Sequence, residues 1–272
     1  MVSARTPLQW GLIGLVWLYL GWLLGLPIAT LVWHGLGAGV GPFVATLFRP
    51  DVAHAFRVTL VLALGAVALN TVFGVALAWV LVRQRFRGQG VVNALIDLPF
   101  AVSPVVAGYM LILLFGRNGW ARGLTDGLGI QVAFALPGML LATTFVSLPF
   151  VVREVGPVLA QLGRDQEEAA RTLGASAWTT FWRVTLPGIR WGVLYGVSLT
   201  LARSLGEFGA VFVVGAAVIG STETATVFIF RALDGRETTA AYTVSIALIG
   251  VSLLLLTGIE GLRARARAEG DG

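Results

Sequence analysis

The residues best placed for specific chemistry lie in one polar segment, 153–191, set between long apolar stretches of the chain. They are acidic, small or helix-breaking, and they occur in this order: Asp165, Glu167, Glu168, Ala169, Ala170, Gly174, Ala175 and Pro187. Carboxylates in the first turn of a helix interact favourably with its dipole, and small side chains let another surface approach closely. The segment therefore predicts recognition of a partner outside the membrane; a capped loop helix without any partner is the alternative.

The same residues predict the local structure that would present this surface. Gly163 is the expected C-cap of the preceding helix, and Asp165 is the expected N-cap of a new one. Glu168 stands three residues after Asp165, where a capping box places a glutamate. Gly174 can end this helix, so we expect a short helix followed by a turn.

A second short helix is expected after that turn. Ser176 is its predicted N-cap, and its aromatic residues are typical of a membrane–water interface: Trp178, Phe181 and Trp182. Pro187 either breaks this helix or occupies the first turn of the next one. The prediction is a helix–turn–helix unit that leads into a membrane span.

A second set of candidate residues lies inside an apolar stretch. Arg203 and Glu207 are four positions apart, which places them on one face of a helix, and charges inside a bilayer must face protein or water. Arg203 can form an internal salt bridge or line an anion pathway, whereas repulsion of anions favours a structural role for Glu207. Positions that can break a helix or offer a hydroxyl group complete the candidate pathway, although packing kinks would explain them equally well: Ser103, Pro104 and Gly206.

The composition excludes several kinds of chemistry. The chain has no cysteine and no lysine, so it has no disulfide, no thiol nucleophile and no ordinary P-loop. Its two histidines, His34 and His54, are far apart in the sequence, which favours loop roles over a metal site. We therefore expect no catalytic residue, metal or cofactor in this chain, and any ATP hydrolysis would have to come from another subunit.

The chain is 57% hydrophobic and only 12% charged, against about 25% charged residues in ordinary globular domains. A bilayer must be the solvent for much of its surface, and a helix needs about 20 apolar residues to cross it. We expect an all-α integral membrane protein with six transmembrane helices, at about Trp10–Trp33, Val58–Val82, Ala94–Phe115, Val132–Val152, Gly192–Val218 and Tyr242–Ile259.

Arginines predict the orientation of these spans, because cytoplasmic loops carry an excess of positive charge. With the N-terminus inside, twelve arginines fall on the inner side and six on the outer side. The inner ones are Arg5, Arg83, Arg85, Arg87, Arg153, Arg164, Arg171, Arg183, Arg190, Arg263, Arg265 and Arg267. Both termini and the 153–191 segment are therefore expected in the cytoplasm. The net charge of +5 then reflects topology rather than nucleic-acid binding, and we expect Arg153 and Glu154 to form an interfacial pair.

The chain divides into three expected parts: an N-terminal helix with an outer loop (1–56), a five-helix core (57–260) and a cytoplasmic tail (261–272). The arginines of the tail are expected to contact anionic lipid. A retained first helix is favoured over a cleaved signal, because its apolar run is too long for a signal peptide.

The polar segment resembles the EAA loop of binding-protein-dependent ABC importers. The matching positions are Glu168, Ala169, Ala170, Gly174, Val184, Leu186 and Pro187, with valine at 184 where isoleucine is commoner. Further stretches, DLPFAVSPVVAG (97–108), LPGMLLATTFVSLPFVVREVGPVL (136–159) and ARSLGEFGAVFVV (202–214), resemble permeases of the sulfate/molybdate group. Within that group the likeness is closest to the second, W-type permease subunit of sulfate/thiosulfate importers, and it covers roughly residues 57–260.

This resemblance implies a type I (MetI-like) importer fold and a non-catalytic permease of a bacterial inner membrane. It implies that the loop is a coupling helix, and that alternating access moves sulfate or thiosulfate inward. The implied partners are two ATP-binding-cassette subunits, a related permease and an extracytoplasmic sulfate-binding protein. Molybdate or tungstate transport and an ion-coupled secondary transporter remain alternatives, while an intramembrane hydrolase lacks a nucleophile and base.

Overall fold

The computed structural model describes residues 7–37 and 39–268, without the side chains of 7 and 262–268, and every regular element in this part is a helix. Four of the arginines predicted on the inner side cannot be placed: Arg5 and the side chains of Arg263, Arg265 and Arg267 lie outside the described residues. The helices are α1 (Pro7–Leu20), α2 (Leu26–Gly37), α3 (Val40–Leu47), α4 (Pro50–Arg83), α5 (Gln89–Ala101), α6 (Pro104–Phe115), α7 (Arg122–Gly127), α8 (Leu136–Leu162), α9 (Asp165–Thr172), α10 (Ala177–Thr180), α11 (Leu186–Leu205), α12 (Gly209–Gly215), α13 (Ala225–Asp234) and α14 (Thr238–Ala268).

Four helical stretches are long and apolar enough to cross a membrane: residues 8–37, α4, α8 and α14. In the first of these, a π-helical turn at Gly21–Gly25 joins α1 and α2 into one rod. Two bent pairs raise the number of spans to as many as six, if each pair is counted as one. This confirms the all-helical membrane class. The predicted 261–272 tail begins inside α14, which continues to Ala268.

The third and fifth predicted spans are bent pairs of helices and not single straight rods. The chain between α5 and α6 bends by 115°, because Ser103 precedes a proline and is held in an extended conformation. The stretch from Ala177 to Leu205 meets α12 at 58°, with the break at residues 206–208. Both breaks fall where the sequence has glycine or proline, but only the structure gives their size.

The helices α4, α8 and α11 form the central bundle and pack through small residues. A Cβ atom on Gly196 of α11 would lie 2.7 Å from the Cα of Val151 on α8, and one on Gly74 of α4 would lie 2.8 Å from the Cβ of Val151. Side chains larger than hydrogen would push these helices apart. The glycines therefore fix how closely the three rods approach one another.

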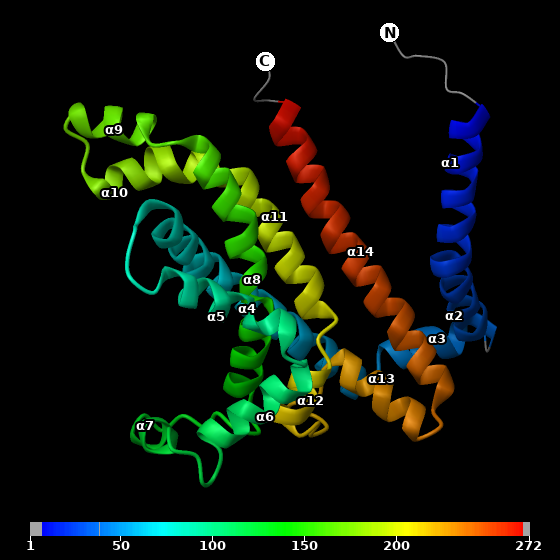
Figure 1. Ribbon diagram of the computed structural model, residues 1–272. Coiled ribbons are helices and arrows are strands. Elements are labelled where there is room, and N and C mark those ends of the chain that lie inside the picture. The colour runs from blue at the N-terminus through cyan, green and yellow to red at the C-terminus, as the bar shows by residue number, and fades with distance from the viewer. Residues whose placement is uncertain (1–6, 38, 269–272) are drawn as a thin grey trace.

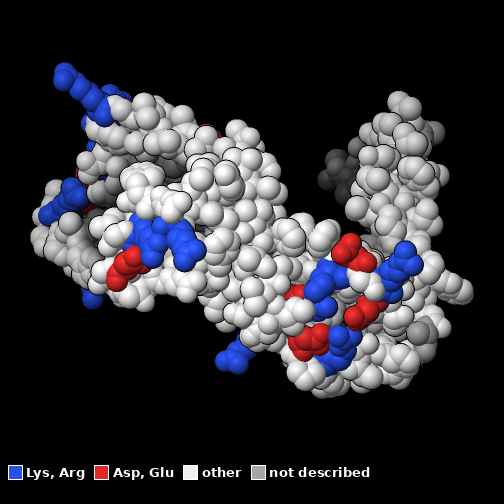
Figure 2. Space-filling model, turned by 90° about the horizontal axis from the view of Figure 1, so that it is seen from below, with Lys and Arg blue, Asp and Glu red and all other residues white. Residues whose placement is uncertain are grey.

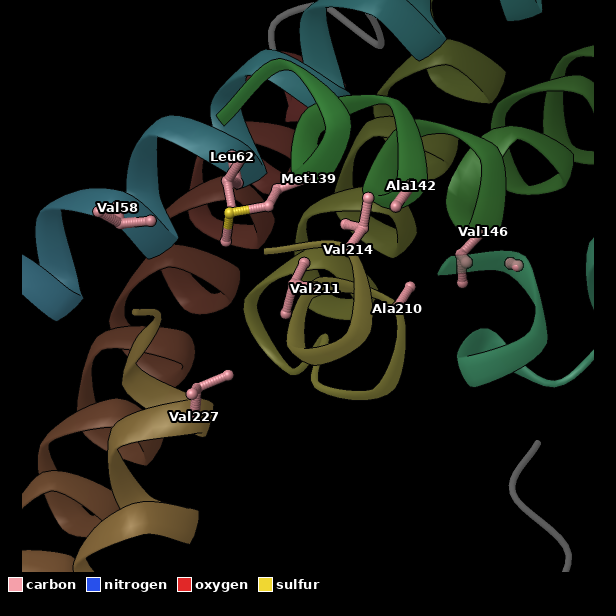
Figure 3. Packing of buried hydrophobic residues seen from close by; sticks show 10 residues of the cluster. Val58, Leu62, Met139, Ala142, Val146, Ala210, Val211, Val214 and Val227 are labelled. Atoms are coloured by element: carbon pink, nitrogen blue, oxygen red, sulfur yellow. The ribbon is translucent and has the colours of Figure 1, made fainter. Parts of the chain in front are cut away.

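The short helix α12 fills the space between α6 and α8 below this bundle. Valines of α12 meet Met139 and Ala142 of α8 and Leu62 of α4 in one apolar cluster, which Figure 3 shows with Val227 of α13 at its edge. Gly209 at the start of α12 lies against Pro104, since an added Cβ would be 3.3 Å from the Cβ of that proline. The break between α5 and α6 is thus next to the break between α11 and α12.

The N-terminal rod stands beside α14 and shares little of the central core. Gly35 on α2 admits Ile246 of α14, and the rings of His34 and Tyr242 lie 5.7 Å apart. In the most apolar window of residues 8–37 no residue is buried, and α1 stands clear of the bundle in Figure 1. The predicted boundary at 56 falls inside α4, whose Val52 and Ala55 are buried against α13.

Figure 1 also shows which segments share an end of the molecule. The start of α1, the elbow formed by α9 and α10, and the end of α14 lie together at the top, whereas α3, α7, α12 and α13 lie at the opposite end. The three segments predicted to face the same side of the membrane are therefore on the same side of the protein.

Candidate functional site

The elbow of α9 and α10 projects from the end of α8. Gly163 ends α8 with a φ of +69°, as predicted, and the chain turns sharply there. Asp165 is not the N-cap, so the predicted capping box is wrong: Arg164 occupies that position in a helical conformation, and no side chain caps α9. The helix α9 begins one residue earlier than predicted. Asp165, Glu167 and Glu168 therefore all lie in its first turn, where their charges interact favourably with the helix dipole.

The turn between α9 and α10 has the predicted chemistry. Gly174 has a φ of +86°, and the Ala175 amide donates a hydrogen bond of 3.0 Å to the carbonyl of Ala170 across the helix end. The hydroxyl of Ser176 accepts a bond of 3.2 Å from the Thr179 amide and caps α10. Since Gly174 needs a left-handed conformation, it sets the angle at which the two helices of the elbow meet.

The tip of the elbow exposes large apolar side chains to water. Leu173 is 89% exposed and Trp178 is 70% exposed, and Glu168 and Ala169 beside them are also exposed. Large apolar side chains exposed together within a polar segment are typical of a contact surface. Leu173 was missed in the sequence, where a single leucine among polar residues carries no distinctive signal.

Glu167 points the other way, into the protein. Its carboxylate lies 3.0 Å from Nη2 of Arg83 at the end of α4, and the Thr185 hydroxyl donates to it at 2.9 Å. The side chains of Arg83 and Glu167 are only 7% and 9% exposed. Sequence reasoning assigned Arg83 only to the topology count, because no local pattern links residues 84 positions apart.

The interfacial helix does not end before the next span. Residues 177–205 form one continuous helix, and Pro187 lies in the first turn of α11, the second of the two predicted alternatives. A π-helical turn, Phe181–Thr185, precedes it, with the Leu186 amide bonded to the carbonyl of Phe181. The wider turn accommodates the missing amide of Pro187, so the helix runs without a break from the elbow into α11.

Arg203 and Glu207 form the predicted ion pair, with 2.8 Å between Nη1 and Oε2. The prediction that they share one helix is wrong, because α11 ends at Leu205, before Glu207. The other carboxylate oxygen of Glu207 accepts a bond of 3.0 Å from the Ala210 amide at the start of α12. Glu207 is 2% exposed and Arg203 is 31% exposed, so the carboxylate joins two helices while part of the guanidinium remains open.

The other pathway candidates lie at the two adjacent breaks. Ser103 and Pro104 begin α6, and Gly206 follows α11, where it is exposed and an added Cβ would meet only the carbonyl oxygen of Ala202, at 3.9 Å. The packing of Gly209 on Pro104 brings the two breaks together. The predicted Arg153–Glu154 pair is replaced by a bond of 2.8 Å from Nε of Arg153 to Asp97 on α5, since the neighbouring Glu154 cannot face it along the helix.

Charged residues at the opposite end form a connected network. Arg231 donates a bond of 2.6 Å to the buried Glu223, and Arg49 pairs with both Asp51 and Glu237. Figure 2 shows acidic and basic side chains alternating over this region. These hydrogen bonds raise the pKa of Arg49 and Arg231 above the usual value. The network joins the start of α4 to α13 and to the residue that precedes α14.

Neither histidine has metal-ligand geometry. His34 lies over Tyr242, and Nε2 of His54 is 3.3 Å from the carbonyl of Ser221. Among the described residues there is no group of three histidine, cysteine or acidic side chains that could hold a metal ion.

A helical membrane bundle with a projecting, apolar-tipped elbow at one end defines a membrane permease. The chain belongs to the family of binding-protein-dependent transport system inner membrane components, which residues 70–265 match. This confirms the family resemblance that the EAA-like segment predicted.

Relatives of known name cover nearly the whole chain. It is 47% identical to the sulfate transport system permease protein CysW of Synechococcus elongatus, over 97% of this chain and 92% of that protein. It is 47% identical to CysW of Escherichia coli K12, over 79% and 75% of the two chains, and 40% identical to the CysT permease of that organism, over 89% and 88%. A chain of the crystal structure of a bacterial alginate ABC transporter in complex with an alginate-bound periplasmic protein shares the fold, with a TM-score of 0.79, 16% identity and coverage of 95% and 94%.

Proposed function

We propose that this chain is the permease subunit of an ABC importer that moves sulfate or thiosulfate into the cytoplasm. The observation that carries the proposal is the 47% identity to a sulfate permease over 97% of the chain. The chain itself catalyses no reaction. ATP and Mg²⁺ bind to separate subunits, whose closure displaces the α9–α10 elbow and opens the bundle outward.

The proposed assembly has two ATPase subunits, a second permease of the CysT kind and an extracytoplasmic sulfate-binding protein. The similarity to both CysW and CysT relatives supports a heterodimer of related permeases. The exposed tip of the elbow offers an apolar contact for an ATPase subunit, and the opposite end faces the binding protein.

We infer that the protein crosses a bacterial cytoplasmic membrane with both termini inside. The arginine excess on the predicted inner segments supports this orientation, as does the common placement of the start of α1, the elbow and the end of α14. The site residues of the elbow then face the cytoplasm, where ATP is available.

Deletion of this chain is expected to abolish uptake of radiolabelled sulfate by cells grown under sulfur limitation. Restoring the gene should return uptake, with thiosulfate competing more strongly than molybdate. Loss of molybdate or tungstate uptake alone would favour the alternative substrate class. Uptake that follows a proton gradient, with no ATPase subunit required, would contradict the importer assignment.

We further propose that Arg203 lines the anion pathway while Glu207 holds the hinge between α11 and α12. Replacing Arg203 with glutamine should lower the maximal rate of sulfate uptake about tenfold, equivalent to ~1.4 kcal/mol, because the partly open cation is lost. Arg203→Lys should retain most of the rate. Uptake and amount of protein in the membrane are measured together, and equal losses in both would show a purely structural role.

A further inference from the structure

We propose that the buried Arg83–Glu167 pair is a positioning joint that makes the coupling elbow and the membrane helices move as one body. The inference rests on the proposed importer function and assigns to Glu167 a role different from docking. Arg83 closes α4 and Glu167 belongs to the first turn of α9, so the pair joins a membrane span to the elbow directly.

The joint connects four helical segments and not only the two that carry the ion pair. Nη2 of Arg83 also donates a bond of 2.5 Å to the carbonyl of Gly163 at the end of α8. The hydroxyl of Thr185, directly before α11, donates to the Glu167 carboxylate, and the Arg164 guanidinium donates to the carbonyl of Arg83. The ends of α4 and α8, the first turn of α9 and the π-helical turn that precedes α11 therefore meet at one ion pair.

Burial makes this connection stiff. With side chains 7% and 9% exposed, both charges are largely shielded from water. Separating the pair would leave an uncompensated buried charge, which is strongly unfavourable. A pull on α9 is therefore transmitted to α4 and α11 before the pair can open.

Two neighbouring glutamates belong to different sites: Glu167 to the joint and Glu168 to the docking surface. Glu168 is exposed, whereas Glu167 is buried against Arg83. Substitutions at 167 should leave the tip of the elbow unchanged and affect only how its movement is transmitted. This gives the experiment a matched control at the next residue.

The experiment uses the complete transporter reconstituted in vesicles, with the sulfate-binding protein and radiolabelled sulfate. Three quantities are measured: ATPase subunits retained on purification, the rate of ATP hydrolysis, and sulfate moved per ATP. For Glu167→Gln and for Arg83→Gln we expect retention and hydrolysis close to wild type, with sulfate per ATP reduced about tenfold. Arg83→Lys keeps the charge but not the forked geometry, so its ratio should be intermediate.

The double variant Arg83→Gln/Glu167→Gln provides the sharpest outcome. It leaves no unpaired buried charge, so its ratio should be no lower than that of either single variant, which is the non-additivity expected of interacting residues. Additive losses, or single variants with an unchanged sulfate-to-ATP ratio, would overturn the proposal. If a single variant fails to accumulate in the membrane, Thr185→Val tests the same joint by removing only one hydrogen bond; an unchanged ratio there would also count against it.

The control variant Glu168→Gln distinguishes the joint from the docking surface. We expect it to weaken retention of the ATPase subunits while the sulfate moved per ATP by the remaining complexes stays unchanged. Failure of wild-type vesicles to bind ATPase subunits would instead overturn the proposed function, which the joint presupposes.

Discussion

Replacing Leu173 with aspartate is expected to release the ATPase subunits from the complex and to reduce sulfate uptake to background. The side chain is 89% exposed at the tip of the elbow, so most of its apolar surface is open to a partner. Loss of a central apolar contact in an interface typically costs about 2–4 kcal/mol, which weakens association by roughly 30- to 900-fold. Retention of tagged ATPase subunits on purification measures the effect.

Leu128→Asp is the matched control, because this leucine is 73% exposed and follows α7 at the opposite end of the protein. It makes the same change in charge and apolar surface, and it should leave ATPase retention unchanged. Equal retention for the Leu173 and Leu128 variants would contradict the assignment of the elbow as the docking surface.

Replacing Gly174 with valine is expected to destabilise the elbow by about 2 kcal/mol and to reduce uptake about tenfold or more. The φ of +86° is unfavourable for a side chain branched at Cβ. An added Cβ would meet nothing within 4 Å, so the cost comes from the backbone and not from crowding. Uptake, together with protease sensitivity of the elbow, reports the change.

Asparagine at the same position separates the two explanations. Asparagine tolerates the left-handed conformation better than other residues with a side chain, although it is larger than alanine. Gly174→Asn should therefore retain most of the uptake, whereas Gly174→Ala should lose more. The reverse order would show that the size of the residue at 174 matters more than its conformation.

The parts of this protein that could be predicted from its sequence are those set by local chemistry. Gly163, Gly174 and Ser176 end or begin helices as expected, because caps and turns involve residues only a few positions apart. The apolar stretches predicted membrane helices for the same reason. Asp165 was misplaced by one residue, since the choice between two adjacent cap positions depends on the turn before it.

Features that depend on distant contacts were not predictable. The Arg83–Glu167 joint connects the last residue of α4 to the first turn of α9. Arg153 donates a hydrogen bond to Asp97 on α5 and not to its neighbour Glu154. At the 115° bend between α5 and α6, Pro104 packs against Gly209 of α12, a contact that no local pattern indicates. Glycine and proline marked where the helices break, while the packing of other helices decided the direction of each break.

The exposed first half of the N-terminal rod has a consequence for the protein in the cell. No residue from 8 to 20 is buried in its own chain, so a newly inserted copy exposes this apolar arm to lipid. Another subunit that packs against the arm would cover its apolar surface, whereas in surplus copies this surface would stay exposed to lipid. Membrane proteases could then distinguish orphan copies from assembled ones, and the ratio of the two permeases would correct itself without matched synthesis.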